Sequence, residues 1–343
     1  MAENTKKRIV VCSDGTWNDP EDENPTNVLR MARAIKPVAD DGIKQVVFYD
    51  WGVGSYYEKV RGGAFGVGIM KNIQDGYRFI VQNFNPGDQV FLFGFSRGAY
   101  TVRCLAGLMN NCGILKRTKA DLIPDAFTMY KQRNAPPGSS RAKNWRKANT
   151  YGEDRGTVDF IGVWDTVGAL GIPTRALAFM NEKDLFYDRE LGSNVRAARH
   201  AVSIDEQRGD FVPTLWTKKE AIDIKQVWFA GVHADVGGGY GPTEGKLLSD
   251  IPLSWMATEA DQFGLEFESH LYVKSRLDPA AAQHRSYKGF YKVLGKLERE
   301  IPEDSVMHES VKKRYASMKA DYKSKPLDNW LEKRNGDWGT LEP

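Results

Sequence analysis

Short apolar runs without polar alternation recur along the chain, and several lead into a stretch with helical periodicity. The runs that we interpret as buried strands span residues 8–13, 45–50, 90–93, 158–164, 200–204 and 226–231. Helical spacing of apolar residues is found at 28–35, 69–84, 99–109 and 251–263. Strands that are apolar on both faces are typical of a parallel sheet covered by helices. The pattern therefore predicts an α/β fold with a mostly parallel central sheet flanked by helices.

The third strand leads into the pentapeptide Gly94-Phe95-Ser96-Arg97-Gly98, with a predicted helix after it. A Gly-x-Ser-x-Gly turn between a strand and a helix is typical of a nucleophile elbow. The tight turn exposes the serine hydroxyl, and the two glycines allow the strand and the helix to approach closely. Ser96 is therefore the candidate nucleophile.

A nucleophilic serine needs a base, and the base needs a carboxylate that orients it. Hydrolases with this elbow carry the three residues in the order serine, acid, histidine. His233 follows an apolar strand directly and is the candidate base, whereas Asp165, at the end of strand 158–164, is the preferred acid. Asp205, at the end of the next strand, is the alternative acid, although a structural pair with Arg208 would also explain it.

The remaining polar residues near the strand ends have simpler interpretations. Asp235 is expected to shape its own loop through backbone hydrogen bonds. His200 opens a predicted strand and is expected to make a core contact, while we expect His270, His284 and His308 at the surface.

Acyl transfer also needs donors for the oxyanion. One is expected to be the N–H of Arg97, the residue after the nucleophile. The other is expected from the loop that follows the first strand, at Gly15 or Thr16, unless that loop serves only as a turn and a helix cap.

Two segments depart from the regular pattern. Residues 116–150 carry nine lysines or arginines against two aspartates, a formal charge of +7. We expect an insertion there, either a solvated excursion or a lid that contacts substrate or anionic headgroups. Residues 285–334 are expected to form a C-terminal helical subdomain packed on a catalytic domain that spans 7–284.

Composition narrows the class of protein. The net charge of +3 gives no indication of nucleic-acid binding. The three cysteines lie in or beside predicted core elements and are expected to be reduced and buried. Without a signal segment or a run of about 18 apolar residues, we expect a cytoplasmic protein, with export by a machinery that reads no cleavable signal left open.

Six ordered motifs between residues 7 and 330 resemble one family. They are SDGTWN at 13–18, PTNV at 25–28, GFSRGAY at 94–100, GVWDTVG at 162–168, AVSIDE at 201–206 and VHADVGGGY at 232–240. The chain resembles a widespread, largely uncharacterised α/β-hydrolase family that includes the catalytic domain of type VI secretion phospholipase effectors. The resemblance implies an α/β-hydrolase fold and a Ser96, Asp165, His233 triad that acts on carboxylic esters, with phospholipase A activity as the best-described example. It implies no cofactor and no metal.

Two other functions compete with the esterase hypothesis. Ser13-Asp14-Gly15-Thr16 resembles the motif of the aspartate-nucleophile phosphatases, but Cys12 stands where their nucleophile would be. A non-catalytic binding or regulatory protein with the same fold is the second. The sequence leaves the ester, its acyl chain, transient contact with a membrane surface and the oligomeric state open.

Overall fold

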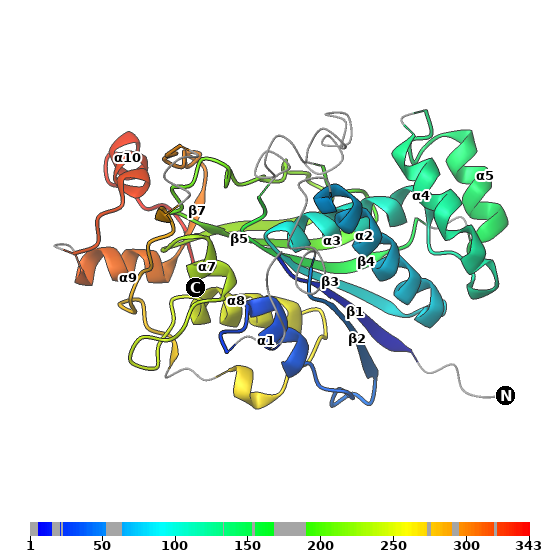
Figure 1. The fold of residues 1–343 in the computed structure, drawn as a ribbon, viewed down its shortest axis with the longest axis horizontal. Coiled ribbons are helices and arrows are strands. Elements are labelled where there is room, and N and C mark those ends of the chain that lie inside the picture. Colours follow the sequence, from blue (N-terminus) through cyan, green and yellow to red (C-terminus); the bar gives the residue numbers. More distant parts are fainter. Residues whose placement is uncertain are drawn as a thin grey trace.

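The computed structural model describes residues 6–15, 21, 23–52, 64–132, 134–152, 155–167, 190–272, 276–289, 295–318 and 321–343. In these residues one sheet has the strand order β2-β1-β3-β4-β5-β6-β7-β8, and every neighbouring pair is parallel (Figure 1). The strands are β1 (Lys7–Ser13), β2 (Lys44–Asp50), β3 (Gln89–Phe95), β4 (Val158–Trp164), β5 (Val195–Ser203), β6 (Asp223–Phe229), β7 (Val306–His308) and β8 (Leu341–Glu342). The predicted α/β fold with a parallel central sheet is confirmed.

Helices cover both faces of the sheet (Figure 1). They are α1 (Asn27–Ala34), α2 (Ala64–Asn83), α3 (Arg97–Cys112), α4 (Ile123–Lys131), α5 (Ser140–Asn149), α7 (His233–Gly237), α8 (Asp250–Asp261), α9 (Glu309–Ser317) and α10 (Lys325–Lys333), with short 3₁₀ helices η1 (Arg117–Leu122) and η4 (Ser269–Leu271).

The strands are buried on both sides because successive side chains enter two different cores. In β1, Ile9 and Val11 pack with the residues of α2 and α3, whereas Val10 and Cys12 pack with those of α1 and α8. This explains why the strands read as continuous apolar runs. The strand ends, rather than the strand faces, are left to carry polar chemistry.

The clearest difference from the prediction is β5, which begins at Val195 rather than at residue 200. Arg196 and Arg199 interrupt the apolar pattern there. Arg199 is nevertheless buried and is paired with Asp223 and Glu259. A buried ion pair of this kind has no local sequence signature.

The described residues of 116–150 pack against the C-terminal half of α3, the half far from Ser96 (Figure 1). Leu115 bridges to Thr150, and the Arg146 guanidinium donates to the carbonyl oxygen of Asn111 at 2.7 Å. Since α3 has 16 residues, its two ends are separated by about 24 Å. The described part of the segment thus packs away from Ser96, and its role as an insertion or a lid stays a prediction.

The residues after 284, which we call the C-terminal segment, pack against the part of the sheet that contains β6. Ile301, Met307, Leu327 and Trp330 share one apolar cluster with Trp228 of β6. The segment thus adds two strands and part of a core, while the domain boundary at residue 284 remains a prediction.

All three cysteines are buried, as expected, and burial raises the pKa values of Cys12 and Cys112. In the ranges described, no helix is both long and apolar enough to cross a bilayer.

Candidate active site

Ser96 lies in a strained turn between β3 and α3. Its backbone has φ 57° and ψ −118°, a conformation that a residue with a side chain rarely adopts. A Cβ atom on Gly94 would lie 2.5 Å from the carbonyl oxygen of Gly98, and one on Gly98 would lie 2.0 Å from that of Ser13. Both glycines of the motif are therefore required by close backbone contacts, as predicted for a nucleophile elbow.

His233 is the first residue of α7, which follows the end of β6 at Phe229 after a short turn. Its Nδ1 atom lies 2.6 Å from Oδ2 of Asp165. The imidazole packs against the rings of Phe95, at a centroid distance of 4.5 Å, and Phe211, at 4.9 Å. Because Phe95 immediately precedes Ser96, these contacts bring the His233 ring to the elbow.

The environment of His233 favours its neutral form. Burial lowers the pKa of the imidazole and outweighs the opposing effect of the Asp165 carboxylate. A neutral imidazole whose Nδ1–H donates to a carboxylate leaves Nε2 as an acceptor. The ring can therefore act as a base at neutral pH.

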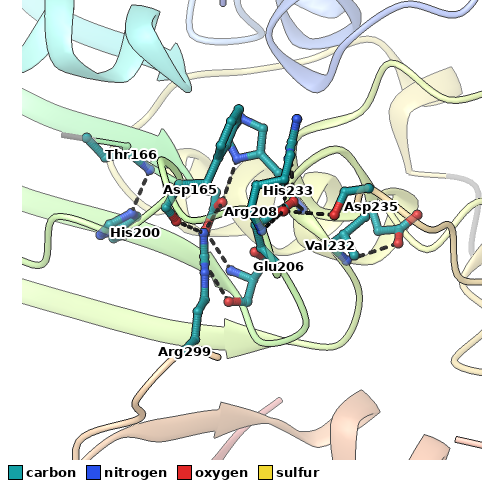
Figure 2. Close-up of polar contacts among 12 residues, drawn as sticks. Asp165, Thr166, His200, Glu206, Arg208, Val232, His233, Asp235 and Arg299 are labelled. Carbon is teal, nitrogen blue, oxygen red and sulfur yellow. Dashed lines mark hydrogen bonds and ion pairs between the residues drawn. The ribbon is translucent and has the colours of Figure 1, made fainter. Parts of the chain in front are cut away.

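Asp165 is completely buried at the end of β4 (Figure 2). Its Oδ1 accepts hydrogen bonds from the Ser203 N–H at 2.9 Å and from Nη1 of Arg299 at 2.6 Å. Its Oδ2 accepts from Nη2 of Arg299 at 2.9 Å and faces His233. Burial would raise the pKa of this carboxyl, but the Arg299 guanidinium and His233 outweigh it and hold the pKa well below its usual range.

Arg299 is the one residue of this group that the sequence analysis missed. It stands between Glu298 and Glu300, so the local pattern is that of a solvated charge cluster. Its side chain is nevertheless fully buried. No local signal distinguishes it from its charged neighbours.

A second buried pair supports the loop of His233. The Glu206 carboxylate accepts from the His233 N–H at 3.1 Å and binds the Arg208 guanidinium through both oxygens. Burial opposes the ionised form of Glu206, yet Arg208 brings its pKa down to about 2. The Arg208 guanidinium, the alternative structural partner for Asp205, bonds to Glu206 through two hydrogen bonds.

Asp205 has a different set of partners. It accepts hydrogen bonds from the hydroxyls of Ser324 and Tyr322 and from the Gly231 N–H. Burial raises its pKa to about 6 although these donors oppose the shift. The carboxylate that contacts His233 is that of Asp165, and the hydrogen bonds of Asp205 serve a different group of residues.

Asp235 shapes its own loop as expected. Its Oδ2 accepts from the Val232 N–H at 3.0 Å, and its Oδ1 lies 2.7 Å from Nδ1 of His284. The His284 ring is stacked on Tyr240 at 4.0 Å and is only partly exposed. Its predicted surface position is therefore only partly correct.

The remaining three histidines differ in their burial and in their contacts. His270 is exposed, as predicted. His308 is buried against Phe229, so its predicted surface position is wrong. His200 makes the expected core contact and accepts from the Thr166 N–H at 3.1 Å.

The candidate oxyanion donors differ in their surroundings. Arg97 is the first residue of α3, so its amide lies at the positive end of that helix, beside Ser96. The Gly15 N–H donates instead to Oδ1 of Asp14 at 2.7 Å, which does not favour the oxyanion role predicted for it. Thr16 lies outside the described residues.

No group of three or more His, Cys, Asp or Glu side chains in the described part of the chain could hold a metal ion.

Several known proteins are similar to this chain. The uncharacterized protein YEL023C of Saccharomyces cerevisiae is 27% identical over 235 residues, which cover 62% of this chain and 33% of the yeast protein. An uncharacterized protein from Pseudomonas aeruginosa is 18% identical, with a TM-score of 0.46, over 95% of this chain and 52% of its own. The Tle1 effector bound to the VgrG spike of the type 6 secretion system is 17% identical, with a TM-score of 0.41, over 69% of this chain and 52% of its own.

The chain thus spans about a third to a half of the length of these proteins. The model of a family described as "T6SS, Phospholipase effector Tle1-like, catalytic domain" matches residues 7–259, which include Ser96, Asp165 and His233. This match confirms the resemblance found in the motifs, and the chain belongs to the Tle1-like phospholipase effector catalytic domain family.

Proposed function

We propose that this protein is a serine hydrolase that cleaves carboxylic esters through Ser96, His233 and Asp165. One observation carries the proposal: the His233 ring is held by Asp165 at 2.6 Å and packs on Phe95, next to a serine in a strained strand-to-helix turn. Nucleophile, base and orienting carboxylate come from three strand ends of one parallel sheet, where such sheets bind their ligands.

The reaction has two halves. In the first, Ser96 Oγ attacks the acyl carbon while His233 Nε2 takes the hydroxyl proton and passes it to the departing alcohol, which leaves an acyl-enzyme. In the second, His233 activates a water molecule that releases the acid. Asp165 keeps the proton on Nδ1 and stabilises the imidazolium that forms transiently.

The tetrahedral intermediate also needs donors for its oxyanion. We assign one to the Arg97 N–H at the start of α3, where the helix dipole favours negative charge. Loss of one such donor costs about 3 kcal/mol of transition-state stabilisation.

For the substrate class we propose lipid or phospholipid acyl esters. The support is membership in a family described by phospholipase effectors.

A fluorophosphonate probe tests the chemistry directly, because it reacts covalently with an activated serine. We expect labelling at Ser96 in the wild type, none in Ser96→Ala, and strongly reduced labelling in His233→Ala. Ser254→Ala, at a serine of α8, is the control and should label normally. Absence of labelling in folded wild-type protein, or labelling that persists in Ser96→Ala, would contradict the proposal.

Hydrolysis of short p-nitrophenyl esters, triglycerides and phospholipid vesicles then compares the substrate classes. Turnover of the short esters alone would keep the ester hydrolase and reject the lipid substrate.

A further inference from the structure

Arg299 reaches the candidate active site from a part of the chain that the family match does not include. The match ends at residue 259, whereas Arg299 lies shortly before β7. Its side chain is fully buried, and Figure 2 shows it approaching Asp165 from the side opposite to His233.

The Arg299 guanidinium binds the Asp165 carboxylate in a bidentate manner. Nη1 and Nη2 donate to the two carboxylate oxygens at 2.6 and 2.9 Å, and also to the carbonyl oxygens of Ser203 and Phe211 at 2.6 and 2.8 Å. Two parallel charge-assisted bonds fix the plane of a carboxylate as well as its position. With the Ser203 N–H on the same Oδ1, the Asp165 carboxylate can present only Oδ2 to His233.

The same arrangement balances charge around the imidazole. The His233 ring contacts Asp165 and its backbone N–H donates to Glu206, and each of these carboxylates is paired with an arginine, Arg299 and Arg208. Asp165 Oδ2 is shared between Arg299 and His233, so the guanidinium charge lies close to the ring. Burial and the nearby Arg208 already disfavour protonation of the imidazole, and a second cation at this range acts in the same direction.

We propose that Arg299 is a positioning residue of the hydrolase site, which orients Asp165 toward His233 and, together with burial of the ring, keeps His233 a free base at neutral pH. This inference rests on the proposed function of Ser96, His233 and Asp165. It makes the segment after residue 284 a functional part of the site, because without that segment the Asp165 carboxylate is buried without its cation.

Two substitutions separate geometry from charge. Arg299→Met removes both, and we expect kcat to fall by roughly 10²-fold with KM changed less than about threefold, because a misoriented acid affects the chemical step. In the plot of kcat against pH, the decline on the acidic side should move to higher pH by about one unit. The reason is that the Asp165 carboxylate then favours protonation of His233 without a competing cation. Arg299→Lys keeps the charge without the bidentate geometry, so its decline on the acidic side should stay near that of the wild type while kcat remains reduced.

The matched control is Arg314→Met. Arg314 is another buried arginine of the C-terminal segment, and its guanidinium donates to the carbonyl oxygens of Pro279 and Ala281. Its replacement should lower thermal stability without moving the pH profile. If Arg299→Met does not fold, the Lys variant carries the comparison.

Proton NMR supplies a readout that needs no turnover. The proton between His233 Nδ1 and Asp165 should give a far-downfield resonance in the wild type and in Arg314→Met, and it should be weakened or lost in Arg299→Met. An unchanged resonance together with an unchanged pH profile in both Arg299 variants would overturn the inference. A wild type without labelling or turnover would instead reject the proposed function, and the resonance would still test the role of Arg299.

Discussion

Asp165 and Asp205 both lie just beyond the ends of neighbouring strands, β4 and β5, yet their environments are opposite. Both are buried, and each accepts several hydrogen bonds. The donors to Asp165 include the cation Arg299, and its pKa lies far below the usual range despite burial. The side-chain donors to Asp205 are neutral hydroxyls, and burial raises its pKa to about 6.

The comparison teaches that burial alone does not decide the charge of a strand-end carboxylate. The partner decides it, and here both partners come from the C-terminal segment. An arginine from that segment keeps one aspartate ionised beside the histidine. Neutral hydroxyls from the same segment only partly offset the effect of burial on the other aspartate, whose pKa is raised to about 6.

The largest expected effect is the difference in activity between Asp165→Asn and Asp205→Asn. In Asp165→Asn, the amide oxygen stays with Arg299 and the NH₂ group turns to His233, so Nδ1 becomes an acceptor and Nε2 carries the proton. The imidazole can then no longer accept the Ser96 proton, and we expect kcat for ester hydrolysis to fall by roughly 10³–10⁴-fold.

Asp205→Asn is the matched control for that experiment. The hydroxyls of Ser324 and Tyr322 can reorient to suit an amide, so kcat should fall by less than about tenfold. Equal losses in the two variants would reject the assignment of Asp165 as the acid.

The second effect concerns how the free energy of unfolding depends on pH. The pKa of Asp205 is raised from 3.8 to about 6 in the folded state, so the folded protein binds a proton more tightly than the unfolded chain between these pH values. Its contribution is therefore greatest below pH 4 and is lost as the pH rises toward 6, by about 2–3 kcal/mol in total. Asp165 has the opposite sign, since its lowered pKa gives stability that is lost as the pH falls below about 4.

Urea unfolding of the wild type and Asp205→Asn between pH 4 and 7 measures the pH-dependent contribution of Asp205 to stability. We expect the stability of the wild type relative to the variant to decrease as the pH rises. A difference that is constant across the range would mean that Asp205 has an ordinary pKa.

The smallest effect is expected for Ser324→Ala, which removes one donor from Asp205. We expect a loss of about 1 kcal/mol in the free energy of unfolding at pH 7 and no change in kcat. Ser317→Ala in α9, whose hydroxyl donates to the Arg314 carbonyl oxygen at 3.4 Å, should stay within about 0.5 kcal/mol. A fall in kcat for Ser324→Ala would indicate that Asp205 is coupled to the hydrolase site.

Much of the fold could be predicted because its signals are local. The strand Val158–Trp164 was predicted with its observed bounds, since all seven of its residues are buried and lack alternation. The start of β5 was missed because Arg199 is buried in an ion pair with partners 24 and 60 residues away. His308 was misplaced for the same reason, since the Phe229 ring that covers it lies far away in the sequence.

The sequence by itself determined the elbow and the order of candidates along the chain. A turn in which Cβ atoms at 94 and 98 would meet backbone at 2.5 and 2.0 Å requires glycine there, and that requirement is visible as Gly-x-Ser-x-Gly. Periodicity determined the parallel sheet, and hence that Ser96, Asp165, Asp205 and His233 all lie at strand ends.

Only the tertiary structure decided which aspartate meets the histidine and what holds it there. The bond between Arg299 and Asp165 joins residues 134 positions apart. Such a contact depends on where the C-terminal segment packs on the sheet. The charge pattern of Glu298, Arg299 and Glu300 does not predict it. Local spacing specifies the backbone conformation, whereas the partners of a buried charge are specified by the whole core.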